Sequence, residues 1–483
     1  MFKILMSGEV NSFEFVAWII IVNFAIYLKT LRFKFVSDDF TAWKNPPVAK
    51  NVWHKWWLRF TGQLKKLSPS VHFISGKSIL EKSGMPSSIK SNRWYMVFMK
   101  TEEFDHLFTL LIHTSICVAI YFAFGANWVS FVAAMLYSTN PMNNQATMWP
   151  SGRGYSLPIL NLLVSISLPI LAPALLFFCT WYTIGFWLPL TLVGSPVWYL
   201  LAFVPICWFF HSRKYKKAID FKHKTEAFKA DREMGWHKFV VFFKTYGFYL
   251  VRCIFPIRIT FYHNFLQSMA GNEMMKRRAR SMDRYFWIGA SFFLWTVYYA
   301  STHWGTSFTW AILGYFFGIF PYCNFVRANQ EIAERFAAPA NVFLMYALAQ
   351  VISHSPIVVV AFFTFYATRA WYTINLYKDE YWITEMAVIE DPNAWWAWHC
   401  RAMKRFDTQS YREALILWVM AKLISPKEFK LLINIATCLR ILGNNKEADE
   451  HLRLAEQNII PGQEDVAYEQ IKNHRDGKLP ILL

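Results

Sequence analysis

The sequence of 483 residues is poor in charge, because Asp, Glu, Lys and Arg make up only 17% of it, against roughly a quarter in an average soluble domain. Glycine (19) and proline (20) are modest in number, which excludes collagen-like and low-complexity chains. The seven cysteines never stand at C-x-x-C spacing, so neither a cysteine zinc motif nor a disulfide scaffold is expected. These absences argue against a soluble enzyme and against a small secreted domain.

Apolar and aromatic residues are abundant instead, at 55% and 19% of the chain. The nearly uncharged run 13–31 is long enough to cross a hydrocarbon core of roughly 30 Å as a helix. Further apolar segments lie at about 104–124, 128–148, 155–176, 178–194, 196–211, 239–262, 285–302, 306–324, 340–353 and 355–373. The sequence therefore predicts an all-α polytopic membrane protein of about eleven transmembrane helices.

The net charge of +18 comes from basic residues that flank apolar segments, which favours lipid headgroups over nucleic acid as partners. The segment 212–238 carries nine Lys or Arg and is expected in the cytoplasm. Counting spans from it places the loop 32–103 and everything after residue 373 outside, in a bacterial inner membrane or an endoplasmic reticulum. Basic residues at 29–34 and 276–284 then fall on the outer side, so either this topology is wrong or they hold phosphate groups.

A helical repeat follows the last apolar segment. Pro392 and Pro426 lie 34 residues apart, which is the tetratricopeptide period. In that register five pairs of small or large residues recur where helices pack closely: Trp398 and Leu432, Ala402 and Ala436, Ala414 and Ala448, Trp418 and Leu452, and Ala421 and Ala455. The sequence predicts a transmembrane domain over 1–373 and a tetratricopeptide-like repeat domain over 374–483. Such an array offers a surface for a protein partner.

Three polar groups of residues interrupt the apolar sequence. Asp38 and Asp39 follow the first span and can act as a general base or hold a cation, or they are simply a solvated pair. The segment 140–155 combines amides with an arginine, a set suited to sugar hydroxyls and a phosphate, or it is a helix break. Residues 331–336 carry two glutamates and an arginine, which are either a second part of the site or a surface ion pair.

The order of these motifs along the chain resembles a known family. An Asp-Asp pair after the first span, an N-P-x-x-x-x-A-x-x-W-x-S-G-R segment (140–153), a Tyr-to-Tyr segment with Pro256 (249–262), a P-x-x-N segment followed by A-E-R (321–335), and terminal repeats occur in that order. The chain resembles the transmembrane and tetratricopeptide-repeat O-mannosyltransferases and their bacterial relatives, of the GT-C glycosyltransferase fold. The resemblance implies transfer of a sugar from a polyprenyl-phosphate donor to a protein or glycan acceptor outside the cytoplasm.

The resemblance also implies roles for individual residues. The expected catalytic carboxylates are Asp38 and Asp39. A divalent cation could bind near them, but the sequence does not identify a metal. The residues expected to bind the donor or the substrate are Asn144, Gln145, Arg153, Arg258, Lys276, Arg277, Arg278, Glu334 and Arg335.

One position departs from the family pattern. Where its members usually carry an acidic pair, this chain has Asn144 and Gln145, and an amide cannot accept a proton as a carboxylate does. The alternative to an active enzyme is therefore a catalytically degenerate membrane scaffold that binds a partner through its repeats. A transporter is a third alternative.

Overall fold

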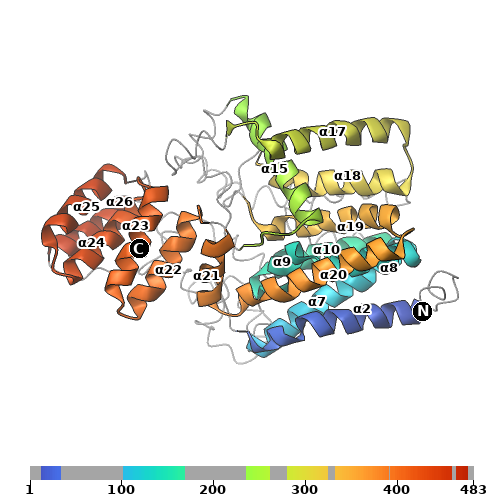
Figure 1. Cartoon of the computed structure of the whole chain (residues 1–483), viewed down its shortest axis with the longest axis horizontal. Coiled ribbons are helices and arrows are strands. Elements are labelled where there is room, and N and C mark those ends of the chain that lie inside the picture. Colours follow the sequence, from blue (N-terminus) through green and yellow to red (C-terminus); the bar gives the residue numbers. More distant parts are fainter. Residues whose placement is uncertain are drawn as a thin grey trace, which may run out of the picture.

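The computed structural model describes residues 12–33, 102–168, 235–260, 280–324, 332–390, 392–459 and 464–476. Every regular element within these ranges is a helix, which confirms the all-α fold class. Figure 1 shows two groups of helices, a larger bundle built from the first three quarters of the chain and a smaller group at its C-terminal end.

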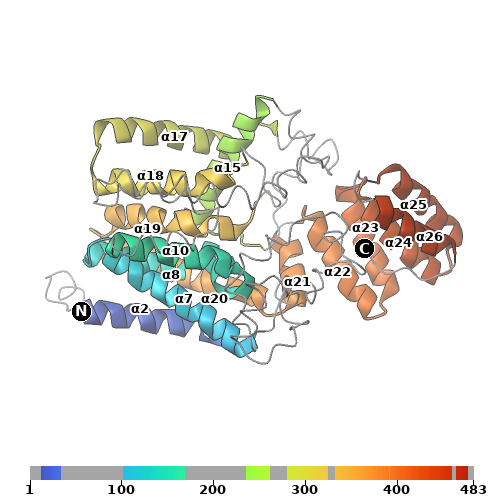
Figure 2. The same ribbon diagram turned by 180° about the vertical axis from the view of Figure 1, so that it is seen from behind.

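The bundle consists of long helices that run roughly parallel or antiparallel to one another in both views (Figures 1 and 2), with α15 crossing them obliquely. Its helices are α2 (Ser12–Tyr27), α7 (Glu102–Ala123), α8 (Trp128–Thr139), α10 (Arg153–Ser167), α15 (His237–Ile254), α17 (Arg284–Thr302), α18 (Ser307–Ile319), α19 (Ala338–Ile352) and α20 (Pro356–Thr373). A short 3-10 helix, η1 (Leu28–Arg32), continues α2.

Three helical segments of the described ranges are long and apolar enough to cross a membrane: Ser12–Arg32, Asp105–Ala123 and Pro356–Tyr377. Large apolar side chains also point outward from the bundle, such as Leu294 on α17 and Ile357 on α20, which are 67% and 83% exposed. An apolar exterior of this kind is costly in water and fits association with lipid. The predicted spans 178–194 and 196–211 lie outside the described residues.

Two predicted spans differ from the structure: the helix in 239–262 ends at Ile254, and 128–148 is broken. The apolar segment 128–148 is not one helix, because α8 ends at Thr139 and two short helices follow, η4 (Pro141–Asn143) and α9 (Asn144–Met148). Pro141 cannot continue the hydrogen-bond ladder of α8, and the side chain of Asn140 accepts the Met142 N–H to start the next turn. A third short helix, η5 (Pro150–Gly152), leads into α10.

Helices α15 and α17 cross at a pair of glycines. A Cβ on Gly247 would lie 2.0 Å from the Tyr285 carbonyl oxygen, and a Cβ on Gly289 would lie 2.0 Å from the Phe243 carbonyl oxygen. Both distances are far below contact, so only glycine lets the two backbones approach this closely.

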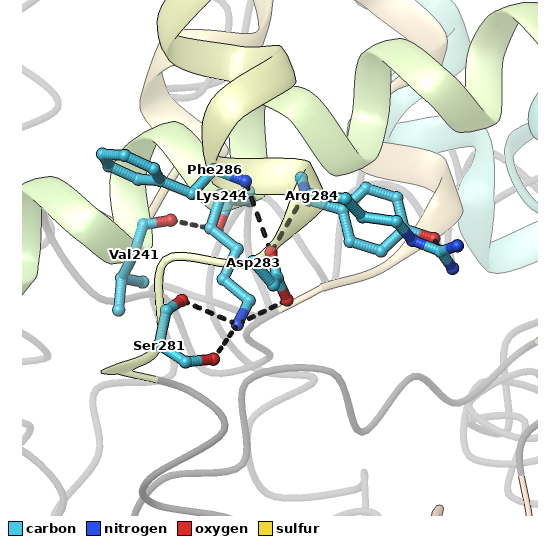
Figure 3. A network of polar contacts seen from close by, with 8 residues as sticks. Val241, Lys244, Ser281, Asp283, Arg284 and Phe286 are labelled. Atoms are coloured by element: carbon cyan, nitrogen blue, oxygen red, sulfur yellow. Dashed lines mark hydrogen bonds and ion pairs between the residues drawn. The ribbon is translucent and has the colours of Figure 1, made fainter.

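A buried ion pair fastens the start of α17 to α15 (Figure 3). The fully buried ammonium of Lys244 lies 2.8 Å from Asp283 Oδ2 and donates to the Ser281 carbonyl at 3.2 Å. The other oxygen of Asp283 accepts the N–H groups of Tyr285 and Phe286, at 3.0 and 3.3 Å. Asp283 is thus both the N-cap of α17 and the counter-ion of Lys244.

Replacing Asp283 with asparagine separates these two roles. Asparagine is an equally good N-cap, so the expected loss of about 1–3 kcal/mol comes from leaving a buried ammonium without its carboxylate. The loss should stay below that of a fully buried pair, because Asp283 is 31% exposed. Thermal unfolding of the detergent-purified protein measures it, and Asp283→Ala, which also removes the cap, should cost about 1 kcal/mol more. An Asp283→Asn protein as stable as the parent would contradict the ion-pair role.

The C-terminal group is a succession of antiparallel helix pairs: α21 (Glu380–Glu390), α22 (Trp395–Asp407), α23 (Tyr411–Ile424), α24 (Phe429–Ile441), α25 (Asn445–Gln457) and α26 (Glu464–Arg475). The small residues of the predicted register, Ala402, Ala414, Ala421 and their partners one repeat later, are all fully buried. Burial thus recurs at the 34-residue spacing, while the tetratricopeptide assignment itself stays a prediction.

Helix α21 links the two groups. Its Ile383 and Met386 belong to the apolar core of the bundle, and its Ala387 and Val388 pack with Ala397 of α22. Trp395 of α22 is buried in the core of the C-terminal helices. The junction therefore uses both faces of α21.

A buried histidine makes the stability of the repeats depend on pH. The Trp418 Nε1–H donates to His399 Nδ1 at 3.1 Å, which requires a neutral ring. Burial, and to a smaller extent the cation of Lys430, lowers the pKa of His399 to about 3, against about 6.5 in an unfolded chain. Below pH 6.5 only the unfolded state takes up this proton, so stability is complete above that pH and falls toward pH 3 by about 1.4 kcal/mol per unit.

We therefore expect the repeats to lose about 2 kcal/mol between pH 6.5 and pH 5. The measurement uses the buried thiols of Cys400 and Cys438, which urea exposes when the repeats unfold. The full-length chain is labelled with a disulfide reagent that reacts in acid, and peptide analysis gives the labelled fraction of each thiol. His399→Asn keeps an acceptor for Trp418 but cannot titrate, and should flatten the profile. His354→Gln, at an exposed histidine of the bundle, is the control. A His399→Asn profile as steep as that of the parent would refute the assignment.

Candidate functional site

Three of the sequence motifs meet at the end of the bundle where α21 begins. They are the broken segment after α8, the non-helical chain after α15, and η10 (Glu334–Phe336), which precedes α19. Direct bonds join them across long sequence separations. Asn140 Nδ2 donates to the Cys253 carbonyl at 2.7 Å, and the Arg335 N–H donates to Gln145 Oε1 at 3.0 Å. The polar residues of the motifs thus form one group, which we call the amide–arginine site (residues 140–145, 253–260 and 334–335).

The amides of the broken segment are fully buried and hold separate elements together. Asn143 Nδ2 donates to the Tyr137 carbonyl at 2.7 Å, and Asn341 of α19 donates to Asn143 Oδ1 at 3.1 Å. Asn144 Nδ2 donates to Thr373 Oγ1 of α20 at 2.9 Å. Polar groups at this depth are costly unless they are paired, and the pairing explains why the helix break is tolerated.

Glu334 and Arg335 face different neighbours. Glu334 is fully buried, and its Oε1 accepts the Thr260 N–H at 2.6 Å. The half-buried guanidinium of Arg335 lies near three aromatic rings, at 5.1 Å from the centroid of Trp149, 5.6 Å from Tyr155 and 5.1 Å from Phe336. Cation–π contacts of this kind help to hold a guanidinium in place.

Residues 255–260 form a non-helical segment whose backbone is fixed by side chains of other elements. Tyr366 donates to the Ile254 carbonyl at 2.8 Å, Arg369 donates to the carbonyls of Pro256 and Ile257, and Arg252 donates to the Arg258 carbonyl at 3.1 Å. Arg258 itself is exposed. A fixed backbone with an exposed guanidinium presents positive charge at this end of the bundle.

Arg153 has a different setting from the one expected. It is fully buried at the start of α10, and its guanidinium lies 2.7 Å from the carboxylate of the fully buried Asp105 and donates to Thr109 Oγ1 at 2.9 Å. This pairing gives Arg153 a structural partner, and its role in donor binding stays a prediction. The signal for Asp105 in the sequence was a carboxylate at the start of an otherwise apolar helix.

Sequence reasoning also missed a buried polar group between α2, α7 and α8. Tyr27 OH donates to the Ser138 carbonyl at 2.7 Å, and the ring of His113 lies 3.3 Å from the same carbonyl and 3.2 Å from Thr147 Oγ1. The hint was a histidine inside an apolar helix, which on its own is more often a satisfied core residue than a functional one.

The remaining predicted residues cannot be placed. Asp38, Asp39, Lys276, Arg277 and Arg278 lie outside the described residues, so their convergence on the amide–arginine site stays a prediction. Within the described ranges no group of three or more His, Cys, Asp and Glu residues is arranged to hold a metal ion. What the site does offer is amide and guanidinium donors beside one buried carboxylate, a set that recognises hydroxyls and anionic oxygens.

Comparison with protein-family models, with curated proteins and with solved structures found no match to this chain.

Proposed function

We propose that this protein is a membrane glycosyltransferase that moves a sugar from a polyprenyl-phosphate donor to a protein or glycan acceptor on the extracytoplasmic side. In this proposal about eleven helices cross the membrane, and the repeats lie on the same side as the reaction. The observation that carries it is the meeting of three distant motif segments in the amide–arginine site, through bonds such as those of Gln145 with Arg335 and Glu334 with Thr260.

For this reaction the protein mainly has to stabilise the charge of the leaving group and to position the reactants. A lipid phosphate leaves with negative charge, which cations in a partly desolvated site stabilise. Arg258 and Arg335 are the described cations at this end of the bundle that suit the task. A carboxylate then removes the proton of the acceptor hydroxyl as it attacks the anomeric carbon. Asp38 and Asp39 are proposed for that step, with Glu334 holding the segment that carries Arg258.

Transfer in a reconstituted system tests the proposal. The full-length protein in liposomes, given a radiolabelled polyprenyl-phosphate sugar and a mixture of acceptor peptides, should label the peptides. Asp38→Asn combined with Asp39→Asn should lower the rate by 100-fold or more, within the usual range for loss of general-base catalysis. Asp379→Asn, at a carboxylate next to α21, is the control. Transfer at the parental rate by the double variant would remove these residues from the chemistry, and no transfer from any polyprenyl-phosphate sugar would favour the alternative.

That alternative is a scaffold that recruits a partner through the repeats, and one observation favours it. Helix α23 exposes an apolar stripe at helical spacing, with Ile416, Val419, Met420 and Leu423 between 38% and 66% exposed. Side chains at i, i+3, i+4 and i+7 are the anchors with which a helix packs on a partner. If the scaffold function holds, Ile416→Asp with Leu423→Asp abolishes complementation of a gene deletion, whereas Asp38→Asn with Asp39→Asn complements fully.

A further inference from the structure

Gln145 uses only half of its hydrogen-bonding capacity. Its side chain is fully buried and its Oε1 accepts the Arg335 N–H, but its Nε2 has no hydrogen-bond partner among the residues that the structure describes. Because a backbone N–H can only donate, this bond fixes the orientation of the amide, and both Nε2 hydrogens are left for another acceptor. A buried donor without an acceptor destabilises a protein, so such groups in native structures call for an explanation.

The surroundings of Gln145 indicate the charge of the missing acceptor. Trp149, four residues after Gln145 and directly after α9, lies against the guanidinium of Arg335, so the cation and the amide donor stand beside the same short helix. Glu334, which precedes Arg335 along the chain, accepts the Thr260 N–H through its Oε1. Two donors, one of them cationic, match an anionic oxygen.

A divalent cation fits this position poorly. Hard cations bind oxygen, and the one oxygen of the Gln145 side chain is already used by Arg335. An amide nitrogen that carries two hydrogens has no lone pair to offer a metal. The donor set therefore differs from that of a site in which carboxylates hold a metal that in turn holds a phosphate.

We propose that Gln145 and Arg335 bind an oxygen of a phosphate ester directly, without a bridging divalent cation. The identity of the ester as a lipid phosphate rests on the function proposed above, whereas the anion site rests on the amide orientation and on Arg335. The half-buried Arg335 is the point of entry, and side chains around Nε2 shift when the anion arrives. Amide and guanidinium then share the phosphoryl oxygens.

Binding to the full-length protein in lipid nanodiscs tests this, with farnesyl phosphate, inorganic phosphate and farnesol as probes and with EDTA present throughout. Farnesyl phosphate should bind and farnesol should not. Gln145→Glu keeps an oxygen for the Arg335 N–H but replaces the donor with a negative charge, and should weaken binding by about 10- to 100-fold. Gln350→Glu is the matched control, because Gln350 accepts a bond from Ser307 through its Oε1 while its Nε2 has no partner among the described residues.

The outcomes separate the alternatives. Inorganic phosphate binding as tightly as farnesyl phosphate supports the anion site and makes a free phosphate its ligand. Absence of farnesyl phosphate binding in EDTA that added Mg²⁺ restores, or a Gln145→Glu protein that binds like the parent, overturns the proposal. Should Gln145→Glu fail to fold, Gln145→Met, which has a similar volume, must weaken binding in its place. This test measures binding and not transfer, so it separates the two proposals. A protein that transfers no sugar can still have the anion site, and an active transferase can lack it.

Discussion

Replacing Gly289 with alanine is expected to disrupt the packing of α15 on α17 and to lower the stability of the bundle by about 3 kcal/mol or more. The new Cβ would meet the Phe243 carbonyl oxygen at 2.0 Å and the Gly247 nitrogen at 2.8 Å. Overpacking usually costs about 1–3 kcal/mol because side chains can yield. Here the obstacle is backbone on a neighbouring helix, so the helices themselves must move apart.

Thermal unfolding and yield of the detergent-purified protein measure this effect. Gly247→Ala should behave in the same way, because its Cβ would meet the Tyr285 carbonyl oxygen at 2.0 Å. Ser291→Ala, an exposed position two residues along α17, is the matched control and should stay within about 0.5 kcal/mol of the parent. A Gly289→Ala protein with the parental unfolding midpoint would show that α15 and α17 do not cross at these glycines.

This crossing also shows where sequence reasoning reached its limit. Among the described residues, hydropathy located long helices such as α2, α7 and α20, because a long apolar run has few alternatives to a helix in lipid. The count of eleven spans stays a prediction. Hydropathy did not indicate which helices touch. An apolar run that contains a glycine has the same hydropathy whether the glycine packs on a neighbouring helix or faces lipid. Hydropathy alone does not show the break at Pro141, but the polar residues of 140–155 already allowed a helix break as one of two interpretations, and the structure has one.

The burial pattern of the C-terminal helices was easier to predict, for a physical reason. Their register depends on residue size at fixed spacing, so Ala402 and Ala436 had to be buried at equivalent positions in successive helix pairs. The candidate site lies between these cases. Gln145 and Arg335 are bonded to each other, although the sequence assigned both to donor binding only through the family resemblance. The partner of Arg153 was out of reach, since a pairing 48 residues apart depends on how α7 and α10 pack.

The pair formed by Arg153 and Asp105 leads to the second large effect. Both side chains are fully buried, so Asp105→Asn leaves a guanidinium without its counter-ion in a desolvated position. Breaking such a pair from one side costs about 3–5 kcal/mol. The exposed pair of Arg440 with Asp449, which has a similar contact distance of 2.6 Å, is the matched control, and Asp449→Asn should cost less than about 1 kcal/mol.

Removing both charges of the buried pair separates structure from function at Arg153. Asp105→Leu combined with Arg153→Met deletes the desolvation cost together with the attraction, and such replacements are often neutral or stabilising. The double variant should therefore regain most of the unfolding midpoint that Asp105→Asn loses.

If Arg153 serves only to pair with Asp105, the double variant also keeps the affinity for farnesyl phosphate. If Arg153 additionally contacts the donor phosphate, the double variant is stable but binds farnesyl phosphate at least about tenfold more weakly, as expected when a charge-assisted hydrogen bond is lost. An Asp105→Asn protein as stable as the parent would show that Arg153 does not depend on this carboxylate.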